Sequence, residues 1–222
     1  MQHRSLKTKG LKIFIRHQES ITILTKVTKH PDFSSIANHI SSRKPFGIES
    51  NIVKSKYWHT GKQRQGYLAC IGKGFSKGFV PSEMVKSNEE VLKAWKVLIP
   101  RANNIGTELK DDNLNSEVCP PMTVCTEAYL FIGVGLSMDE VQAKNATKYM
   151  RTKFVRYMHS LAKTSHDGTN KTYRFVPLQD FTSGSDIDWS QSVADIDRQL
   201  YEKYALTPDE IAFIEEKLRP MV

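Results

Sequence analysis

The chain has 222 residues, of which 39% are hydrophobic and 25% are charged, as is ordinary for a soluble globular protein of one large or two small domains. Its 32 Lys and Arg outnumber 24 Asp and Glu, so the formal net charge is +8 and the pI is about 9.3. This basic excess favours a polyanionic partner, with nucleic acid ahead of an acidic membrane; the alternative is a basic protein that is merely soluble.

Cysteine use and apolar stretches indicate the compartment. Cys70, Cys119 and Cys125 cannot all pair within the chain, and few, unpaired cysteines are typical of a reducing cytoplasm. No apolar stretch follows the basic N-terminus as it would in a secretory signal. The longest apolar stretch, around 129–134, is far shorter than the ~20 residues that cross a bilayer. We therefore expect a cytoplasmic protein with no membrane partner.

Hydrophobic periodicity predicts many short elements in the first 135 residues, because a spacing of two favours strands and a spacing of three to four favours helices. In chain order we first expect a strand at 10–15, a helix at 18–29, a short helix at 33–40, and loops and edge strands at 41–65. A strand at 67–71, a mobile turn at 72–78 and a short helix capped by Asn88 at 89–94 should follow. The last elements expected are a strand at 95–101, a long loop at 103–121 and strand structure at 123–134.

The remaining residues predict mainly helices. Ser137 and Glu140 have the spacing of a capping box, which predicts one long helix to about Lys163, about 40 Å in length. A second box, Thr207 with Glu210, predicts a final helix to about Leu218. Between them we expect a polar turn at 165–172, an extended piece at 173–176, a linker at 182–191 and a helix at 193–204.

Strands and helices mix without regular βαβ alternation, so the predicted fold class is α+β. We expect a mixed-sheet domain with long loops over residues 1–135. A mainly helical part, including the long bracing helix, would pack on it over residues 136–222.

Two stretches match motifs of adenine methyltransferases only superficially. Gly133-Val134-Gly135 follows a predicted strand, yet no acidic residue ends a strand about 20 positions further on, and a lone Gly-x-Gly is weak. Cys119-Pro120-Pro121-Met122 lacks the amide and the aromatic ring that would hold a flipped adenine. We expect neither S-adenosylmethionine binding nor catalysis from these residues.

A metal-dependent restriction nuclease is an alternative interpretation of the sequence. Asp32, Glu108 and Lys110 match the letters of a signature in which two acids and a lysine bind Mg²⁺ and orient water. However, Asp32 is far from the other two in sequence, and Glu108 falls in a predicted loop. The cysteines and the scattered histidines show no zinc-ligand spacing. We therefore expect no metal site.

Basic residues in loops are better supported as functional candidates. Loops 41–47, 73–77 and 100–104 combine cations with hydroxyls, amides or glycines. Arginine can donate two hydrogen bonds to guanine, asparagine can pair with adenine, and lysine neutralises a phosphate from any direction. The alternative for each loop is ordinary turn chemistry, and for the cations of the long helix it is a solvated face.

Seven stretches, spread in order along most of the chain, resemble a known family: SRKPFG at 42–47, WKVLIPRA at 95–102, TEAYLFIG at 126–133, YMRTKFVR at 149–156, FVPLQDF at 175–181, LYEKY at 200–204 and IAFIE at 211–215. In this order they resemble the C-terminal target-recognition region of bacterial type II N6-adenine DNA methyltransferases, some of which are fused to a nuclease. In that family an N-terminal Rossmann-like domain binds S-adenosylmethionine and methylates adenine, and the C-terminal region reads the DNA sequence.

The resemblance implies sequence-specific recognition of double-stranded DNA, without catalysis, for a type II restriction-modification enzyme. The catalytic half has no counterpart in this sequence, so the methyltransferase domain that holds S-adenosylmethionine would lie in cis or in trans. A type I-like specificity subunit is a neighbouring alternative, and a basic subunit that docks on a protein is a third.

We therefore predict residues 1–135 to be a DNA target-recognition domain, with no catalytic residue, metal or cofactor in this chain. Arg101 is expected to reach a base edge and Lys163 a phosphate. The predicted DNA contacts are Arg43, Lys44, Lys73, Lys77, Arg101, Asn103, Lys163 and Arg174.

Overall fold

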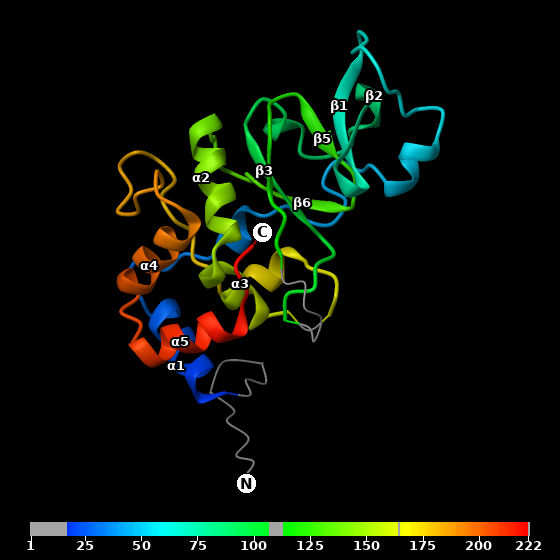
Figure 1. Cartoon of the computed structure of the whole chain (residues 1–222). Helices are drawn as coiled ribbons and strands as arrows, with labels where there is room; N and C mark the ends of the chain where they lie inside the picture. The colour runs from blue at the N-terminus through cyan, green and yellow to red at the C-terminus, as the bar shows by residue number, and fades with distance from the viewer. Residues whose placement is uncertain (1–16, 107–112, 164, 222) are drawn as a thin grey trace.

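A computed structural model describes residues 17–106, 113–163 and 165–221 and arranges them in three layers, as an α+β fold (Figure 1). The strand expected at 10–15 lies outside the described residues. The helices are α1 (Gln18–Thr28), α2 (Glu140–Arg151), α3 (Lys153–Ser160), α4 (Val193–Lys203) and α5 (Pro208–Lys217), and the strands are β1 (Tyr67–Gly72), β2 (Ser76–Pro81), β3 (Lys96–Pro100), β4 (Glu117–Cys119), β5 (Thr123–Cys125) and β6 (Tyr129–Ile132). Short 3₁₀ turns occur at Ile36–His39, Ser50–Lys54, Lys73–Phe75, Ser82–Met84, Glu89–Val91 and Asn170–Tyr173.

The central layer is the antiparallel sheet β4-β3-β6, in which β3 pairs with both neighbours. Successive side chains of a strand point to opposite faces, so Val97 and Ile99 enter the core on the helical side and Leu98 enters the core on the other side. Because both faces are covered, residues 97–99 of β3 and the whole of β6 are continuous apolar runs rather than alternating ones.

The outer layer is the sheet β2-β1-β5, in which β1 is antiparallel to β2 and parallel to β5. Leu68, Cys70 and Val80 fill the space between the two sheets. The rings of Phe46 and Phe131 stack in the same core with centroids 5.3 Å apart. The β1–β2 pair lies at the edge of the molecule that is farthest from the helices (Figure 1).

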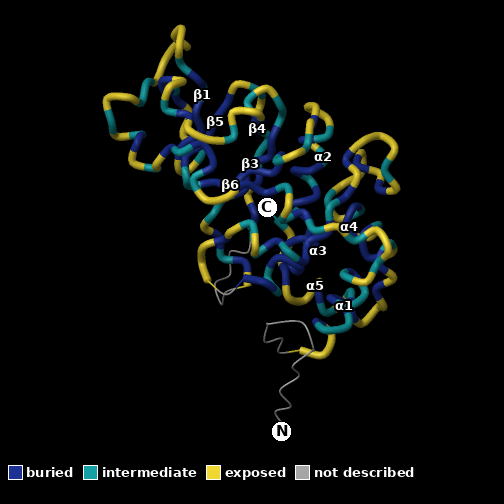
Figure 2. Tube along the Cα trace, turned by 180° about the vertical axis from the view of Figure 1, so that it is seen from behind, coloured by how far each residue is buried: buried dark blue, intermediate teal, exposed yellow. Residues whose placement is uncertain are grey.

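The third layer is helical and covers the other face of the central sheet. Ile23, Leu24 and Val27 of α1 share one core with apolar residues of α2 to α5. This core therefore contains residues from both sides of position 135, and the two cores do not divide at the boundary expected from the sequence. Figure 2 shows the buried residues running through the centre of the molecule, with exposed residues at the loop ends. No helix among the described residues is long and apolar enough to cross a membrane.

The α+β class and several predicted elements are confirmed, namely α1, β1, β3, α4 and α5. The best-predicted boundary is the start of α5. The Thr207 hydroxyl accepts a hydrogen bond from the Glu210 amide at 3.3 Å, and the Glu210 carboxylate accepts one from the Thr207 amide at 2.8 Å. Pro208 follows in the first turn, where its missing N–H has no cost.

The single long helix is wrong, because the chain becomes extended at Thr152 and divides it into α2 and α3. The buried Thr152 hydroxyl donates to the Tyr149 carbonyl at 2.7 Å and accepts from the Val155 amide at 3.2 Å. The capping box of α2 also begins later than expected. Asp139, rather than Ser137, exchanges hydrogen bonds with Gln142 at 2.8 and 3.0 Å.

Five shorter predictions are also corrected. Residues 72–78 contain the turn and the first half of the second strand of the β1–β2 ribbon, and the helix at 33–40 is only a 3₁₀ turn. Asn88 does not cap with its side chain, since its amide donates to the Pro45 carbonyl. The loop at 103–121 contains β4, and a 3₁₀ turn occupies part of the extended piece expected at 173–176.

Candidate nucleic-acid interface

Residues 50–82, which we call the basic lobe, form a stretch of cations without acidic residues. The lobe contains six Lys and Arg and no Asp or Glu, so this segment alone has a formal net charge of +6. Its cations are Lys54, Lys56, Lys62, Arg64, Lys73 and Lys77.

The six cations are all exposed. The lobe comprises β1, β2 and the segment before them, at the outer edge of the molecule (Figure 1), with exposed residues along its loops (Figure 2). Within the described residues none of the six pairs with a carboxylate, although the Lys56 ammonium lies 5.3 Å from the centroid of the Tyr57 ring. Cations without acidic partners keep their full attraction for a polyanion.

Two contacts attach the segment before β1 to the strand pair. His59 exchanges backbone hydrogen bonds with Phe79 at 3.0 and 2.8 Å, so this segment adds a short bridge at the free edge of β2. The indole of Trp58 lies over Gly72 and Gly78, which have no side chains to obstruct it. The glycines at 72 and 78 thus allow close packing and hold the cations of both segments in one lobe.

Three of the predicted loops meet beside the lobe, at residues 127–129. The Arg43 guanidinium donates to the Glu127 carboxylate at 3.3 Å, and Nε of Arg101 donates to the Glu127 carbonyl at 3.1 Å. The Tyr129 hydroxyl accepts from the Phe75 amide at 2.7 Å and donates to the Gly72 carbonyl at 3.1 Å, which fixes the turn that carries Lys73. The structure therefore brings together the loops of Arg43, Lys73 and Arg101.

The cations in these loops differ in whether they pair with a carboxylate. Arg43 is 65% exposed but is paired with Glu127, and Lys44 contacts Glu49 at 2.5 Å. The hydrogen bond from Lys44 lowers the pKa of the Glu49 carboxyl. Lys73 and Lys77 belong to the basic lobe and have no acidic partner among the described residues. Of the predicted contacts, these two are the best placed to bind phosphate.

Arg101 and Asn103 serve the fold. Besides Glu127, the Arg101 guanidinium pairs with Asp167, and the side chain is only 21% exposed. The Asn103 side chain is buried, accepts from the Ile105 amide at 3.3 Å and donates to the Pro100 carbonyl at 3.4 Å. The polar groups of both residues are thus engaged within the protein, and the expected DNA contacts of Asn103 and of Arg101 at a base edge stay predictions.

Lys163 is buried and follows the end of α3 rather than ending a long helix. Its ammonium donates to the carbonyls of Asn103 at 2.5 Å and Ile105 at 3.0 Å, and burial lowers its pKa. The ammonium is thus engaged with the 103–105 turn, and the expected phosphate contact stays a prediction. Arg174 is half-buried, donates to the Lys171 carbonyl at 3.1 Å and lies over the Phe175 ring.

The sequence prediction missed four cations of the basic lobe, Lys54, Lys56, Lys62 and Arg64. The sequence signal for them is the absence of acidic residues over the whole of 50–82.

The described residues give little support to other chemistry. Asp32 is exposed and lies 3.9 Å from His30, while Glu108 and Lys110 lie outside the described residues. No group of three or more His, Cys, Asp or Glu in the described ranges is placed to hold a metal. The three cysteines are buried thiols, and burial raises the pKa of Cys119 to about 11.

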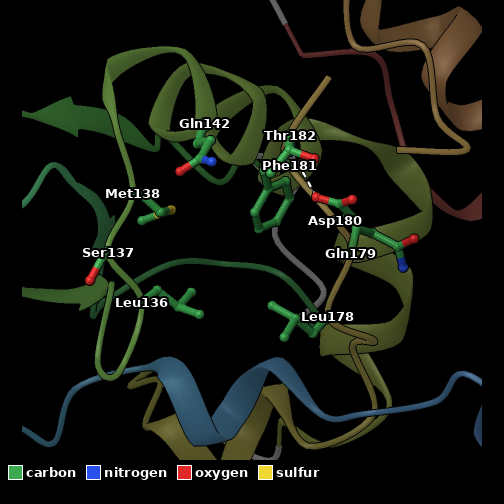
Figure 3. A pocket seen from close by; sticks show the side chains of 9 residues that line it. All are labelled: Leu136, Ser137, Met138, Gln142, Leu178, Gln179, Asp180, Phe181 and Thr182. Atoms are coloured by element: carbon green, nitrogen blue, oxygen red, sulfur yellow. Dashed lines mark hydrogen bonds between the residues drawn. The ribbon is translucent and has the colours of Figure 1, made fainter. Parts of the chain in front are cut away.

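The glycine motif at 133–135 does not fit a cofactor. The amides of Gly133 and Val134 donate to the His39 carbonyl at 2.9 and 3.1 Å, so neither is free to bind a nucleotide or an adenosyl group. A hollow of about 260 Å³ lies between the loop before α2 and residues 178–182 (Figure 3). Its Gln142 caps α2, and Asp180 accepts from the Thr182 amide at 2.8 Å, so these polar groups are satisfied internally.

No protein-family model matches the chain, and a search of curated proteins finds no match to it. The charge and geometry of the basic lobe, together with the sequence resemblance, are therefore the guide to function.

Proposed function

We propose that the chain binds double-stranded DNA through the basic lobe. The observation that carries the proposal is the set of six exposed cations between residues 50 and 82, with no Asp or Glu among them. A polyanion that approaches this face meets no repulsive carboxylate within the lobe. Lysine tolerates many contact geometries, so five lysines and one arginine are suited to a phosphate backbone.

The placement of the lobe supports the same function. The lobe lies at an edge of the fold, away from the helical layer, where a long rod-shaped ligand can approach it (Figure 1). Arg43 and Lys44 flank it, and each can exchange its surface carboxylate for a phosphate at small cost, because exposed ion pairs contribute about 1 kcal/mol or less.

Within DNA binding, the more specific role that we propose is target recognition for an N6-adenine methyltransferase of a type II restriction-modification system. The sequence resemblance supports this role, and in it the S-adenosylmethionine-binding domain would act in cis or in trans. Because the polar groups of Arg101, Asn103 and Lys163 are engaged within the fold, backbone contact in this role falls to the lobe.

A salt titration tests the proposal. The affinity for a short fluorescent duplex would be measured by anisotropy from about 50 to 200 mM salt, and six neutralised phosphates give a slope of log K against log salt of about −5. Absence of binding at the lowest salt, or a slope near zero, would refute it.

A further inference from the structure

The outer face of the β1–β2 ribbon is half-exposed and aromatic. Strand alternation places Leu68, Cys70 and Val80 toward the core, and Tyr67 and Phe79 on the opposite face. The register sets Ala69 opposite Phe79 and Tyr67 opposite Pro81, so the two rings are diagonal neighbours, with small Ala69 beside them. Within the described residues, neither ring belongs to either core.

A third ring completes this face. His59 joins the edge of β2, and its imidazole lies 6.4 Å from the ring centroids of both Tyr67 and Phe79. Two other aromatic side chains of the lobe, Trp58 and Phe75, have structural partners. Trp58 lies over Gly78, and the Phe75 ring lies 5.0 Å from that of Tyr129.

The charged residues of the lobe that carries the three rings are all cations. On β2, Lys77 lies two positions before Phe79 and therefore faces outward as well. It pairs with Ile71 of β1, and its side chain is exposed. The remaining cations of the lobe lie in the segment before β1 and in the turn between β1 and β2, and the lobe contains no carboxylate. Half-buried rings on a sheet face, with cations in the adjoining segments, are an arrangement with which proteins hold unpaired nucleotides: the bases stack on the rings and the cations bind the phosphates.

We propose that His59, Tyr67 and Phe79 form a stacking platform for unpaired bases, so that the basic lobe binds single-stranded DNA in addition to duplex. The inference rests on the proposed function of the lobe and adds a second class of DNA to it. In a duplex the face of each base is covered by its neighbours, so only an unpaired base can contact the rings. The platform therefore discriminates between the two forms, whereas the cations do not.

The test compares a fluorescent single-stranded oligonucleotide with its duplex for the unaltered chain and for Tyr67→Leu and Phe79→Leu. Leucine keeps an apolar side chain on the strand but removes the stacking surface. Each substitution is expected to weaken single-strand binding by about 5-fold or more, because base–aromatic stacking contributes about 1–3 kcal/mol per base, and to leave duplex binding within about 2-fold.

Phe213→Leu is the matched control. Phe213 of α5 is also half-buried, its ring lies 5.4 Å from that of His17, and the Lys217 ammonium lies over it, but it is outside the lobe. Its replacement is expected to change neither affinity. The fold of each variant is checked by its thermal melting transition.

A second measurement needs no variant. An oligonucleotide that contains the fluorescent base 2-aminopurine should change its emission on binding, because stacking on an aromatic ring quenches it. Unchanged emission, together with unchanged single-strand affinity in any leucine variant that folds, would overturn the platform while leaving duplex binding intact. Absence of binding to either form of DNA at low salt would overturn both the platform and the proposed function.

Discussion

The indole of Trp58 occupies the space where a side chain on Gly78 would stand, and a Cβ atom at position 78 would overlap the ring atoms Cε2 and Cζ2. This contact joins the segment before β1 to the ribbon and so keeps the cations of the basic lobe together. The packing of the lobe therefore requires a residue without a side chain at position 78.

Gly78→Ala is expected to destabilise the protein by about 1–3 kcal/mol, because the indole must move out of a well-packed position. Urea unfolding measures this change. Gly184→Ala is the control, since its nearest neighbour, the Thr182 hydroxyl, would lie 3.6 Å from the new Cβ and its φ is not positive. Equal stability of the two variants would show that Trp58 does not hold the lobe.

Lys73→Gln is expected to weaken DNA binding to a similar degree on any sequence and to flatten the salt slope by about one unit, as the loss of one phosphate contact does. Lys144→Gln is the comparison, because Lys144 is also exposed but pairs with Glu140 at 2.6 Å, outside the lobe. Salt titrations of the two variants should differ, and identical slopes would argue against a role for the lobe.

Two arginines that both contact Glu127 should differ in their effect on stability. Arg101→Ala removes an ion pair with Asp167 and a bond to the Glu127 carbonyl from a largely covered side chain, and a loss of about 1–3 kcal/mol is expected. Arg43→Ala removes one exposed contact and should cost less than about 1 kcal/mol. Thermal or urea unfolding decides between this order and its reverse, which would mean that Arg101 is not a structural residue.

The protein should lose stability as the pH falls below neutrality, because of His159. This ring is buried, stacks on Tyr173 with centroids 4.0 Å apart, and has a pKa lowered by burial from 6.5 to about 3. The unfolded chain therefore takes up a proton between pH 6.5 and 3 that the folded chain does not, so stability is complete above 6.5 and decreases toward 3.

Between pH 7 and 5 the protonation of His159 in the unfolded chain should lower the free energy of unfolding by about 2 kcal/mol. His159→Asn keeps a possible donor for the Thr172 carbonyl, which the imidazole contacts at 3.1 Å, but does not titrate. Urea unfolding at the two pH values should show a smaller loss for the variant. An equal loss in both proteins would mean that other groups cause the acid sensitivity.

Local signals in the sequence predicted the elements whose boundaries depend on local contacts. Thr207 and Glu210 exchange their hydrogen bonds within one turn, so the start of α5 could be predicted from four residues. The break between α2 and α3 could not. The apolar stripe continues through it, whereas Asp197 of α4 accepts the amides of Lys153 and Phe154 at 2.9 Å each, a contact made only in the folded chain.

The candidate site shows the same division. The acid-free stretch at 50–82 is a property of the sequence and could have been found there. The difference in burial between Lys73 and Lys163 could not have been predicted, since both are lysines near the boundaries of predicted elements. Lys163 is buried because the Asn103 and Ile105 carbonyls surround its ammonium, and those residues are distant in sequence.

Lysine labelling of the unaltered chain, with and without duplex DNA, tests the central claim most directly. An acetylating reagent and mass spectrometry would give the reactivity of each lysine in both states. If the basic lobe binds DNA, the DNA protects its five lysines, while exposed lysines elsewhere, such as Lys29, Lys144 and Lys217, react equally in both states. The five are Lys54, Lys56, Lys62, Lys73 and Lys77. Protection of those outlying lysines with the lobe unprotected, or no protection under conditions where DNA binds, would contradict binding through the basic lobe.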